Sequence, residues 1–236
     1  MVATGTRAPL PVVRSISRSR YGQSKSFPYL PLPCPPSLAP SFTKPRLPMP
    51  RLRPGSLLIS QPFLGDPNFE RTVVLLCSHS DEEGTFGLVL NRPATLRLGD
   101  VLELPGGETL PATHIPLGIG GPVQPDTLHY LHQRADLPQA SHLGDQVYWG
   151  GSFSQLLEQL ISGQAAPDDV RLYVGYSGWT AGQLAEEVRE NVWIVHPNAA
   201  AKVFTLTTDA FWQSILREKG GRYRMLSNYP TDPRLN

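Results

Sequence analysis

Proline is distributed so unevenly along this 236-residue chain that it limits where a fold can form. Residues 1–50 hold 11 of the 25 prolines, seven serines and seven of the 21 Lys and Arg residues, with no Asp or Glu. Proline lacks a backbone donor and fixes φ, so a run such as "PYLPLPCPPSLAP" cannot form a helix or a central strand. We therefore predict a disordered extension over residues 1–50 and one folded domain over residues 51–236.

Two explanations of the extension stay open. Its Arg- and Ser-rich, acid-free composition resembles an organellar transit peptide. Proline this dense would break the amphipathic helix of a mitochondrial presequence, which favours the alternative of a start codon placed upstream of a true start at Met49. We expect a cytoplasmic protein in the second case and an organellar one in the first.

The charge of the domain limits the partners that it can bind. Residues 51–236 hold the remaining 14 Lys and Arg residues against all 20 Asp and Glu residues, which leaves a net charge of −6. Phosphate backbones require clustered Lys and Arg, so direct nucleic-acid binding is disfavoured. The longest apolar run, "TVVLLC", has the length of a strand and falls far short of the ~18 residues of a membrane span. We expect no membrane span.

Short apolar runs bounded by Gly, Pro, Asn or Asp predict a strand-rich first half. These strands are predicted at residues 56–60, 72–78, 86–91, 115–120, 127–133 and 146–150, with a short helical turn near Leu98.

The second half alternates, and its helix signals are stronger. A helix begins with an S-x-x-Q capping box at Ser152 and stops at Gly163. The other elements predicted there are a strand at 170–176, a helix after Thr180, a strand at 191–195 and a last helix from Asp209 to Gly220. Strand–helix alternation favours parallel strands with right-handed crossovers. We predict a single α+β domain with a large mixed sheet, in which β-α-β-α-β and a terminal helix follow the strand-rich half.

Ser177 lies in "VGYSGWTAGQL", between a predicted strand and a predicted helix, where a nucleophile elbow would present a serine. Gly175 fits the G-x-S-x-G motif, but Trp179 occupies the position of the second glycine. His196 is the one downstream histidine, and the acidic residues before it lie on the adjacent predicted helix (Glu186, Glu187 and Glu190). We favour a turn at residues 177–178 followed by a T-x-x-Q helix cap. Ser177 stays the catalytic candidate of an alternative, hydrolase hypothesis.

Arg71 and Arg92 form the best candidate anion site. They flank two apolar segments, and antiparallel pairing of these segments would bring both guanidinium groups to one edge of the sheet. Two such groups can bind a carboxylate or a phosphate. Structural ion pairs with Asp66, Glu70 or Asp100 are the commoner outcome for residues of this type, and they remain the alternative.

Other polar motifs give weaker signals. The Gly-rich segment 118–125 could offer backbone N–H groups to an anion, but it lacks the lysine of a P-loop, and a structural turn is favoured. His129 and His132 would lie on opposite faces of one strand, so we expect no metal site and no cofactor. Cys34 lies in the extension, and Cys77 ends an apolar strand, where we expect a buried, unreactive thiol.

Several stretches taken together resemble the YqgE/AlgH family of bacterial proteins. They are "GSLLISQPFLGDPNFERTVVLLCSH", "GLVLNRP", "GGPVQPDTLHYLH", "GYSGWTAGQLAEEV" and "NYPTDPRLN", and they cover residues 55–236 in order. The resemblance implies a single-domain α+β protein with a large mixed sheet, cytosolic in bacteria and with plastid relatives in plants. It implies no established activity. The family is labelled as transcriptional regulators, but no stretch of this sequence resembles a DNA-binding motif. The residues that match its motifs are our candidate ligand-binding set: Arg71, Asn91, Arg92, Gly120, Gly121, Gly178 and Trp179.

These observations lead to one main hypothesis and two alternatives. We expect a non-catalytic soluble domain that binds a protein partner or a small anionic ligand, with an indirect role in regulating gene expression. A hydrolase that uses Ser177 and a direct DNA-binding regulator are the alternatives. We lean towards a protein that is not an enzyme, because no complete catalytic set can be assembled from the sequence.

Overall fold

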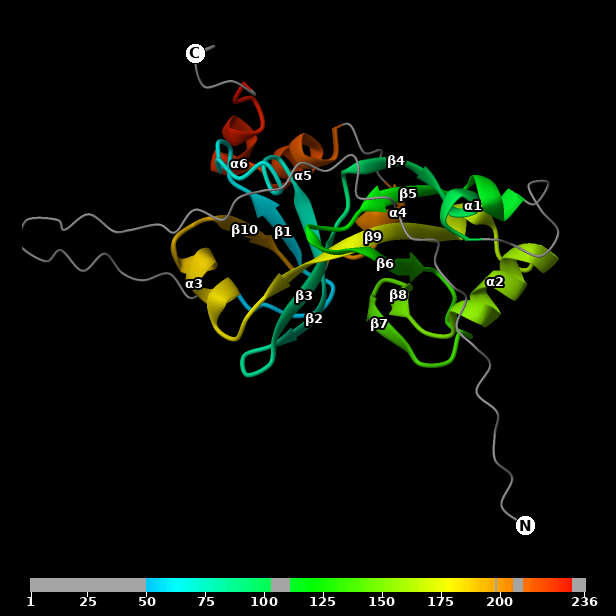
Figure 1. Ribbon diagram of the computed structural model, residues 1–236. Helices are drawn as coiled ribbons and strands as arrows, with labels where there is room; N and C mark the ends of the chain where they lie inside the picture. The colour runs from blue at the N-terminus through cyan, green and yellow to red at the C-terminus, as the bar shows by residue number, and fades with distance from the viewer. Residues whose placement is uncertain (1–49, 103–110, 198, 206–209, 231–236) are drawn as a thin grey trace, which may run out of the picture.

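The computed structural model describes residues 50–102, 111–197, 199–205 and 210–230. The predicted extension up to residue 49 and the predicted helix cap at Asp209 lie outside these residues. Ten strands form one mixed sheet (Figure 1). They are β1 (Leu57–Ser60), β2 (Val73–Ser80), β3 (Gly84–Val89), β4 (Pro93–Arg97), β5 (Pro116–Ile119), β6 (Val123–His132), β7 (Ala140–Gly144), β8 (Val147–Gly150), β9 (Val170–Trp179) and β10 (Trp193–His196).

The sheet consists of two groups of strands that share β9. The first group has the order β10-β1-β2-β3, the second contains β6-β8-β7 and the pair β4-β5, and all neighbours within each group are antiparallel. Residues 177–179 of β9 pair with β3, whereas residues 172–174 pair in parallel with β5. The other edge of β9 pairs with β6. Figure 1 shows β9 running as one long strand between the two groups.

The helices cover both faces of the first group and one side of the second. They are α1 (Leu98–Val101), α2 (Phe153–Ser162), α3 (Gln183–Arg189), α4 (Lys202–Thr205), α5 (Phe211–Lys219) and α6 (Gly221–Leu226), with 3-10 turns at Pro111–His114 and Pro167–Asp169. In β1, Leu57 and Ile59 pack towards α4 and α5, while Leu58 packs towards α3. This alternation buries the first group on both faces, and α1 and α2 pack over the second group.

The predicted α+β fold with a large mixed sheet is confirmed, and the predicted details agree with the structure in some elements and differ in others. The helix α2 begins at the predicted Ser152 cap and ends at Gly163, which has the left-handed φ of 76°. The predicted turn at residues 177–178 is wrong, because β9 continues to Trp179. Strands β8, β9 and β10 run in one direction, but other strands separate them, and the one parallel pair among the described strands is β5–β9.

Candidate functional site

Arg71 and Arg92 lie at the same end of the β2–β3 pair, and both guanidinium groups donate to backbone carbonyls. Nη2 of Arg71 donates to the carbonyl oxygens of Tyr229 (2.6 Å) and Pro230 (2.5 Å). Its guanidinium carbon lies 4.9 Å from the ring centroid of Trp212, a cation–π distance. Arg71 therefore holds the C-terminal segment against the sheet.

Arg92 has an equally structural environment. Its Nη2 donates to the carbonyl oxygen of Pro67 at 2.5 Å. Burial lowers the pKa of Arg92, and the nearby carboxylates of Asp66 and Glu70 act in the opposite direction. The bonded partner is a backbone carbonyl, whereas the structural alternative of the sequence prediction was an ion pair with Asp66, Glu70 or Asp100. The contact supports a role in fixing the loop between β1 and β2.

Asn91 bridges the same two segments through its side-chain amide. Its Oδ1 accepts from the backbone N–H of Val73 at 2.9 Å, and its Nδ2 donates to the carbonyl of Arg71 at 2.8 Å. The amide thus extends the β2–β3 ladder by two bonds beyond the last paired residues.

Gly120 and Gly121 lie where β9 passes closest to the connection between β5 and β6. A Cβ on Gly120 would lie 2.4 Å from the carbonyl oxygen of Gly175, and a Cβ on Gly121 would lie 2.2 Å from that of Tyr176. Real Cβ atoms do not approach a backbone oxygen so closely, so both positions require glycine. The N–H of Gly120 donates to Val174, which makes it part of the sheet.

Ser177 is a buried strand residue and not an exposed elbow serine. Its side chain is 0% exposed, and Oγ donates to the carbonyl oxygen of Gly120 at 3.1 Å. The downstream histidine, His196, lies in β10, and strands β3, β2 and β1 separate β10 from β9 in the sheet. The geometry does not bring together the serine and the base that an elbow mechanism requires.

A groove with a cavity volume of about 590 Å³ lies at the other end of β3, where the β2–β3 hairpin meets the last residues of β9. Ser78, Phe86 and Gly178 line it and are cross-strand partners, so they share one face of the sheet. Tyr176, two residues before Gly178, lies on the same face. Gly178 is exposed, and a Cβ there would lie 3.1 Å from Cε2 of Tyr176. The missing side chain of Gly178 therefore keeps the groove open.

Phe86 and Tyr176 line the groove. With His129 and Trp149 behind them they form a cluster of four half-buried rings, which we call the aromatic shelf. Phe86 stacks on Tyr176 with centroids 4.6 Å apart, and it contacts Trp149 at 4.9 Å and His129 at 5.1 Å. Burial lowers the pKa of His129 and so favours its neutral form. The shelf is an uncharged, partly exposed aromatic surface next to the groove.

Trp179 also lines the groove, but its ring packs on the opposite face of the sheet, against α3. It is 6% exposed, and its indole Nε1 donates to Oε2 of Glu187 at 2.8 Å. Trp193 of β10 donates to the same oxygen at 2.7 Å. Gln183 donates to the other carboxylate oxygen at 3.0 Å and accepts from the backbone N–H of Thr180. The Gln183 side chain thus makes the reverse bond of the predicted T-x-x-Q box, but the predicted cap at Thr180 is wrong, because Gly182 is the N-cap and α3 begins at Gln183. The carboxylate of Glu187 fixes α3 to two strands.

The hairpin at the groove has an acidic rim and one hydroxyl–imidazole pair. Asp81, Glu82 and Glu83 are consecutive and exposed. Nδ1 of His79 is 2.7 Å from Oγ1 of Thr85, its direct cross-strand partner, and Nε2 is 3.6 Å from Asp81. The Thr85 hydroxyl is buried with its residue 8% exposed, so we assign the pair to the stability of the hairpin.

His129 and His132 lie on opposite faces of β6, as their spacing predicts. His132 is 0% exposed; its Nε2 lies 2.9 Å from the carbonyl oxygen of Gly150, and its Nδ1 accepts from the backbone N–H of Arg134. Burial lowers the pKa of His132. Among the described residues, no group of three or more His, Cys, Asp or Glu side chains could hold a metal ion.

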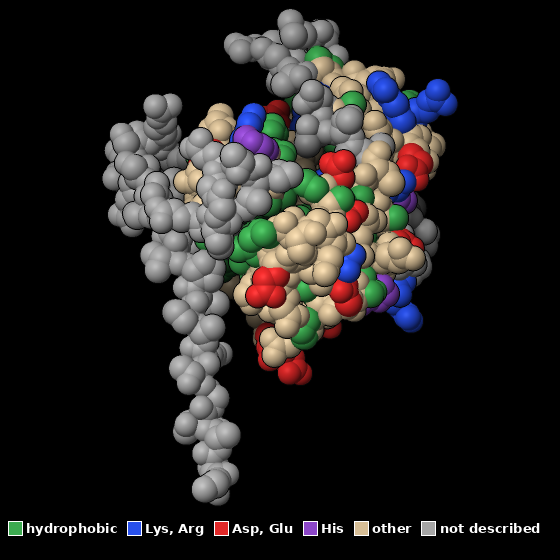
Figure 2. Space-filling model, turned by 90° about the vertical axis from the view of Figure 1, so that its right-hand side faces the viewer, with side chains coloured by type: hydrophobic (Ala, Val, Ile, Leu, Met, Phe, Trp, Pro, Cys, Tyr) green, Lys and Arg blue, Asp and Glu red, His purple; other side chains and the backbone are tan. Residues whose placement is uncertain are grey.

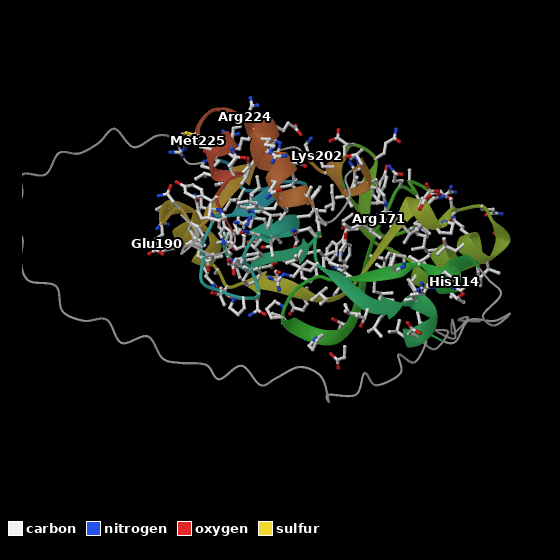
Figure 3. The ribbon with its side chains drawn as sticks, turned by 90° about the horizontal axis from the view of Figure 1, so that it is seen from above. His114, Arg171, Glu190, Lys202, Arg224 and Met225 are labelled. Atoms are coloured by element: carbon white, nitrogen blue, oxygen red, sulfur yellow. The ribbon has the colours of Figure 1, made fainter. Side chains whose placement is uncertain are left out.

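Basic side chains are densest on α5 and α6, and several of them have partners within the fold. Lys219 donates to the carbonyl of Val195 at 2.9 Å, and Arg222 lies 5.0 Å from the ring of Tyr223. Lys202 of the neighbouring α4 pairs with Glu218 of α5 at 2.6 Å. Arg224 and the 68% exposed Met225 lie on the outside of α6 (Figure 3). The side of the molecule that carries α1 and α2 shows acidic and basic side chains interspersed (Figure 2).

The predicted site residues therefore lie in three separate places. Gly178 and Trp179 lie at the groove, beside the first residues of β3, whereas Arg71, Asn91 and Arg92 lie beyond its last residue. Gly120 and Gly121 lie between them, against β9. The sequence prediction missed Phe86 and Tyr176 as groove residues. In each strand the aromatic residue is next to a smaller one, Thr85 in β3 and Ser177 in β9, so the alternation placed Phe86 and Tyr176 on one face of their own strands. It could not show that β3 and β9 are neighbours.

Fold and groove define a mixed-sheet α+β domain with an open aromatic site. The AlgH-like family model matches residues 57–224, and the chain belongs to this family. A UPF0301 protein of Cytophaga hutchinsonii is 43% identical over 187 residues, which cover 78% of this chain and 100% of that protein. A UPF0301 protein of Chlorobium limicola is 40% identical and covers 79% of this chain and 97% of its own length. The predicted family is confirmed.

Two solved structures share the fold. The solution structure of the AlgH protein from Pseudomonas aeruginosa superimposes with a TM-score of 0.58 at 33% identity, over 75% of this chain and 93% of that one. A crystal structure of a protein from Corynebacterium diphtheriae gives a TM-score of 0.60 at 22% identity, over 78% and 95% of the two chains. Within the described residues, no helix combines the length and apolarity that a membrane crossing requires.

Proposed function

We propose that the protein is a non-catalytic binding module and that its groove binds an extended segment of a protein partner. The observation that carries this proposal is the aromatic shelf, in which Phe86 stacks on Tyr176 at 4.6 Å beside a groove kept open by Gly178. Partly exposed aromatic rings around a groove are a common feature of peptide-binding surfaces, because they offer large apolar area with little side-chain entropy to lose. The cytoplasmic location stays a prediction.

A protein partner is favoured over a small anion by the charges around the two candidate places. The guanidinium groups of Arg71 and Arg92 donate to backbone carbonyls. The groove carries Glu83 at its rim, next to Asp81 and Glu82, and like charges would repel a phosphate or carboxylate. An influence on gene expression would then be indirect and would pass through the bound partner.

A random peptide library tests the proposal. The full chain is immobilised and panned with phage that display random 12-residue peptides, and enriched peptides are titrated by Trp fluorescence. We expect enrichment of aromatic and proline-rich sequences, with binding about tenfold weaker, or ~1.4 kcal/mol, to Gly178→Thr. Arg92→Ala is the matched control at the other end of β3 and should bind like the wild type. Equal binding of the enriched peptides to wild type and Gly178→Thr would refute the groove as the site.

Two further probes separate the alternatives. Titration with inorganic phosphate should give no saturable change in Trp fluorescence, whereas a saturable change that Arg92→Ala abolishes would support the anion-binding version. A fluorophosphonate probe should not label Ser177, since its hydroxyl is buried and bound to Gly120. Labelling that Ser177→Ala removes would establish the hydrolase alternative instead.

A further inference from the structure

The groove lies beside the point at which the N-terminal extension enters the fold. The N–H of Gly55 donates to the carbonyl of Leu76 at 2.8 Å, and the N–H of Leu76 donates to that of Ser56 at 2.9 Å. These bonds continue the antiparallel β1–β2 pairing towards Ser78, which lines the groove. Residues before Gly55 therefore start next to the groove wall formed by β2.

The extension contains the sequence chemistry that aromatic grooves recognise. Pro28 and Pro31, and again Pro33 and Pro36, have the P-x-x-P spacing. A polyproline II helix has three residues per turn, so prolines at this spacing share one edge and can insert between aromatic rings. Such segments lose little entropy on binding, which is why aromatic-lined grooves select them.

Opposite charges also favour contact between the extension and the groove. The rim of the groove carries three consecutive exposed carboxylates, Asp81 to Glu83. Residues 1–50 carry seven Lys and Arg residues and no acidic residue, and Lys25 and Lys44 flank the uncharged stretch that holds the two P-x-x-P motifs. The next two basic side chains, Arg51 and Arg53, are exposed. Opposite charges of this kind steer two surfaces together and select orientation.

We propose that the proline-rich segment 26–40 binds the aromatic groove of its own chain and acts as an intramolecular ligand that a partner must displace. This inference rests on the groove being the binding site proposed above. Residues 41–54 form the connection between the segment and the fold. A chain of that length extends by roughly 3.3–3.6 Å per residue, which is ample for a site that adjoins its anchor. A short tether also raises the local concentration of the ligand to the order of millimolar, so a weak intrinsic affinity suffices.

The two cysteines make a direct test possible in the full chain. Cys34 lies within the segment, whereas Cys77 is buried, and burial raises the pKa of its thiol well above the ordinary value. A thiol-reactive nitroxide should therefore modify Cys34 selectively in the native protein. In ¹⁵N-labelled full chain expressed from Met1, we expect the nitroxide to broaden the amide signals of Ser78, Phe86 and Gly178, and reduction of the nitroxide should restore them.

A groove-filling variant gives the control. Gly178 has no left-handed φ, so Gly178→Thr introduces a strand-favouring residue without backbone strain, and its Cβ meets the movable ring of Tyr176. We expect this variant to lose the broadening, while Ser154→Thr on the exposed start of α2 keeps it. Broadening that is equal at the groove and at α2, or that Gly178→Thr leaves unchanged, would overturn the proposal.

The remaining outcomes separate this inference from the proposed function. A sample in which nitroxide and ¹⁵N are on different molecules should show no broadening, and broadening there would mean docking between copies and overturn the intramolecular contact. If the groove signals do not respond to the nitroxide but library peptides bind, the self-ligand fails and the proposed function stands. If neither the nitroxide nor any peptide affects the groove, both fail.

Discussion

At the scale of single residues, one carbonyl oxygen connects three parts of the sheet. The oxygen of Gly120 accepts from the N–H of Val89 at 2.8 Å and from the hydroxyl of Ser177 at 3.1 Å. It thereby links β3, β9 and the connection between β5 and β6. An apolar side chain in place of Ser177 would remove one of the two donors to this buried carbonyl oxygen.

The first prediction concerns that hydroxyl. Ser177→Ala should lower the free energy of unfolding by about 1 kcal/mol, the usual net value of one hydrogen bond, and leave peptide binding unchanged. Urea denaturation at constant m-value measures this difference. Ser162→Ala is the matched control, because that hydroxyl also donates to a carbonyl but is exposed. Equal midpoints for the two variants would contradict a structural role for Ser177.

His132 gives a prediction for the pH dependence of stability. Burial lowers its pKa in the folded state, so the unfolded chain binds more protons once the pH falls below the ordinary value of about 6.5. The contribution of His132 to stability is therefore complete above that pH and is lost as the pH falls towards the folded-state pKa. Burial lowers the pKa of His129 and His196 in the same direction.

Urea denaturation between pH 7.5 and pH 5 measures this loss. His132→Gln keeps a donor near Gly150 but does not titrate, so its free energy of unfolding should fall less steeply with decreasing pH than that of the wild type. His142→Gln, at an exposed position, should keep the wild-type slope. A wild-type slope in His132→Gln would show that other groups carry the pH dependence.

At the scale of elements, α3 is fixed to the sheet by one carboxylate and two apolar side chains. Glu187 accepts from the indoles of Trp179 and Trp193, and Leu184 and Val188 pack into the core beneath them. Helix α3 has seven residues, too few to be stable alone in water. Its order therefore depends on these contacts.

Removal of that carboxylate should loosen α3 before the rest of the molecule. Glu187→Ala leaves two largely buried indole donors without their acceptor, at a cost of about 2 kcal/mol. Amide hydrogen exchange within α3 should accelerate by roughly 30-fold as a result. Glu186→Ala, which removes the exposed ion pair with Arg189 on the same helix, should change exchange little. Similar acceleration in both variants would refute the special role of Glu187.

The elements also show how much of the fold could be predicted from the sequence. Helix α2 was predictable at both ends because its signals, Ser152 and Gly163, are local. Strands β4 and β7 were missed because half-exposed, short strands carry few apolar residues. The end of β9 was misplaced because "GYSGW" has turn composition, while the close approach that requires glycine there comes from distant residues. The groove could not be predicted for the same reason: it depends on the pairing of β3 with β9.

At the scale of the whole molecule, β9 makes the two strand groups one folding unit. Of the described strands, β9 alone pairs with members of both groups. Gly175, with φ of 68°, lies between the segment that pairs with β5 and the segment that pairs with β3. A Cβ there would lie 2.6 Å from the carbonyl oxygen of Gly121. We expect both groups to unfold in a single cooperative transition.

A pair of glycine variants tests this coupling. Gly175→Ala adds a left-handed alanine and a backbone clash, and it should cost about 3 kcal/mol, with amide exchange accelerated equally in β10 and β8. Gly163→Ala has nearly the same φ, 76°, but nothing within 4 Å of the added carbon, so it should cost only about 1 kcal/mol. Destabilisation confined to one group of strands would show that β9 does not couple them.

The position of β9 late in the chain has a practical consequence for dividing the protein. The exposed stretch between α2 and β9, residues 163–164, separates eight strands of the two groups, β1 to β8, from the strand that joins them. A polypeptide broken there would leave one fragment with the flanking strands and the other with the shared strand, so each would need its counterpart to complete the sheet. The two fragments should therefore reassemble on mixing, which would make this fold a natural starting point for a split reporter.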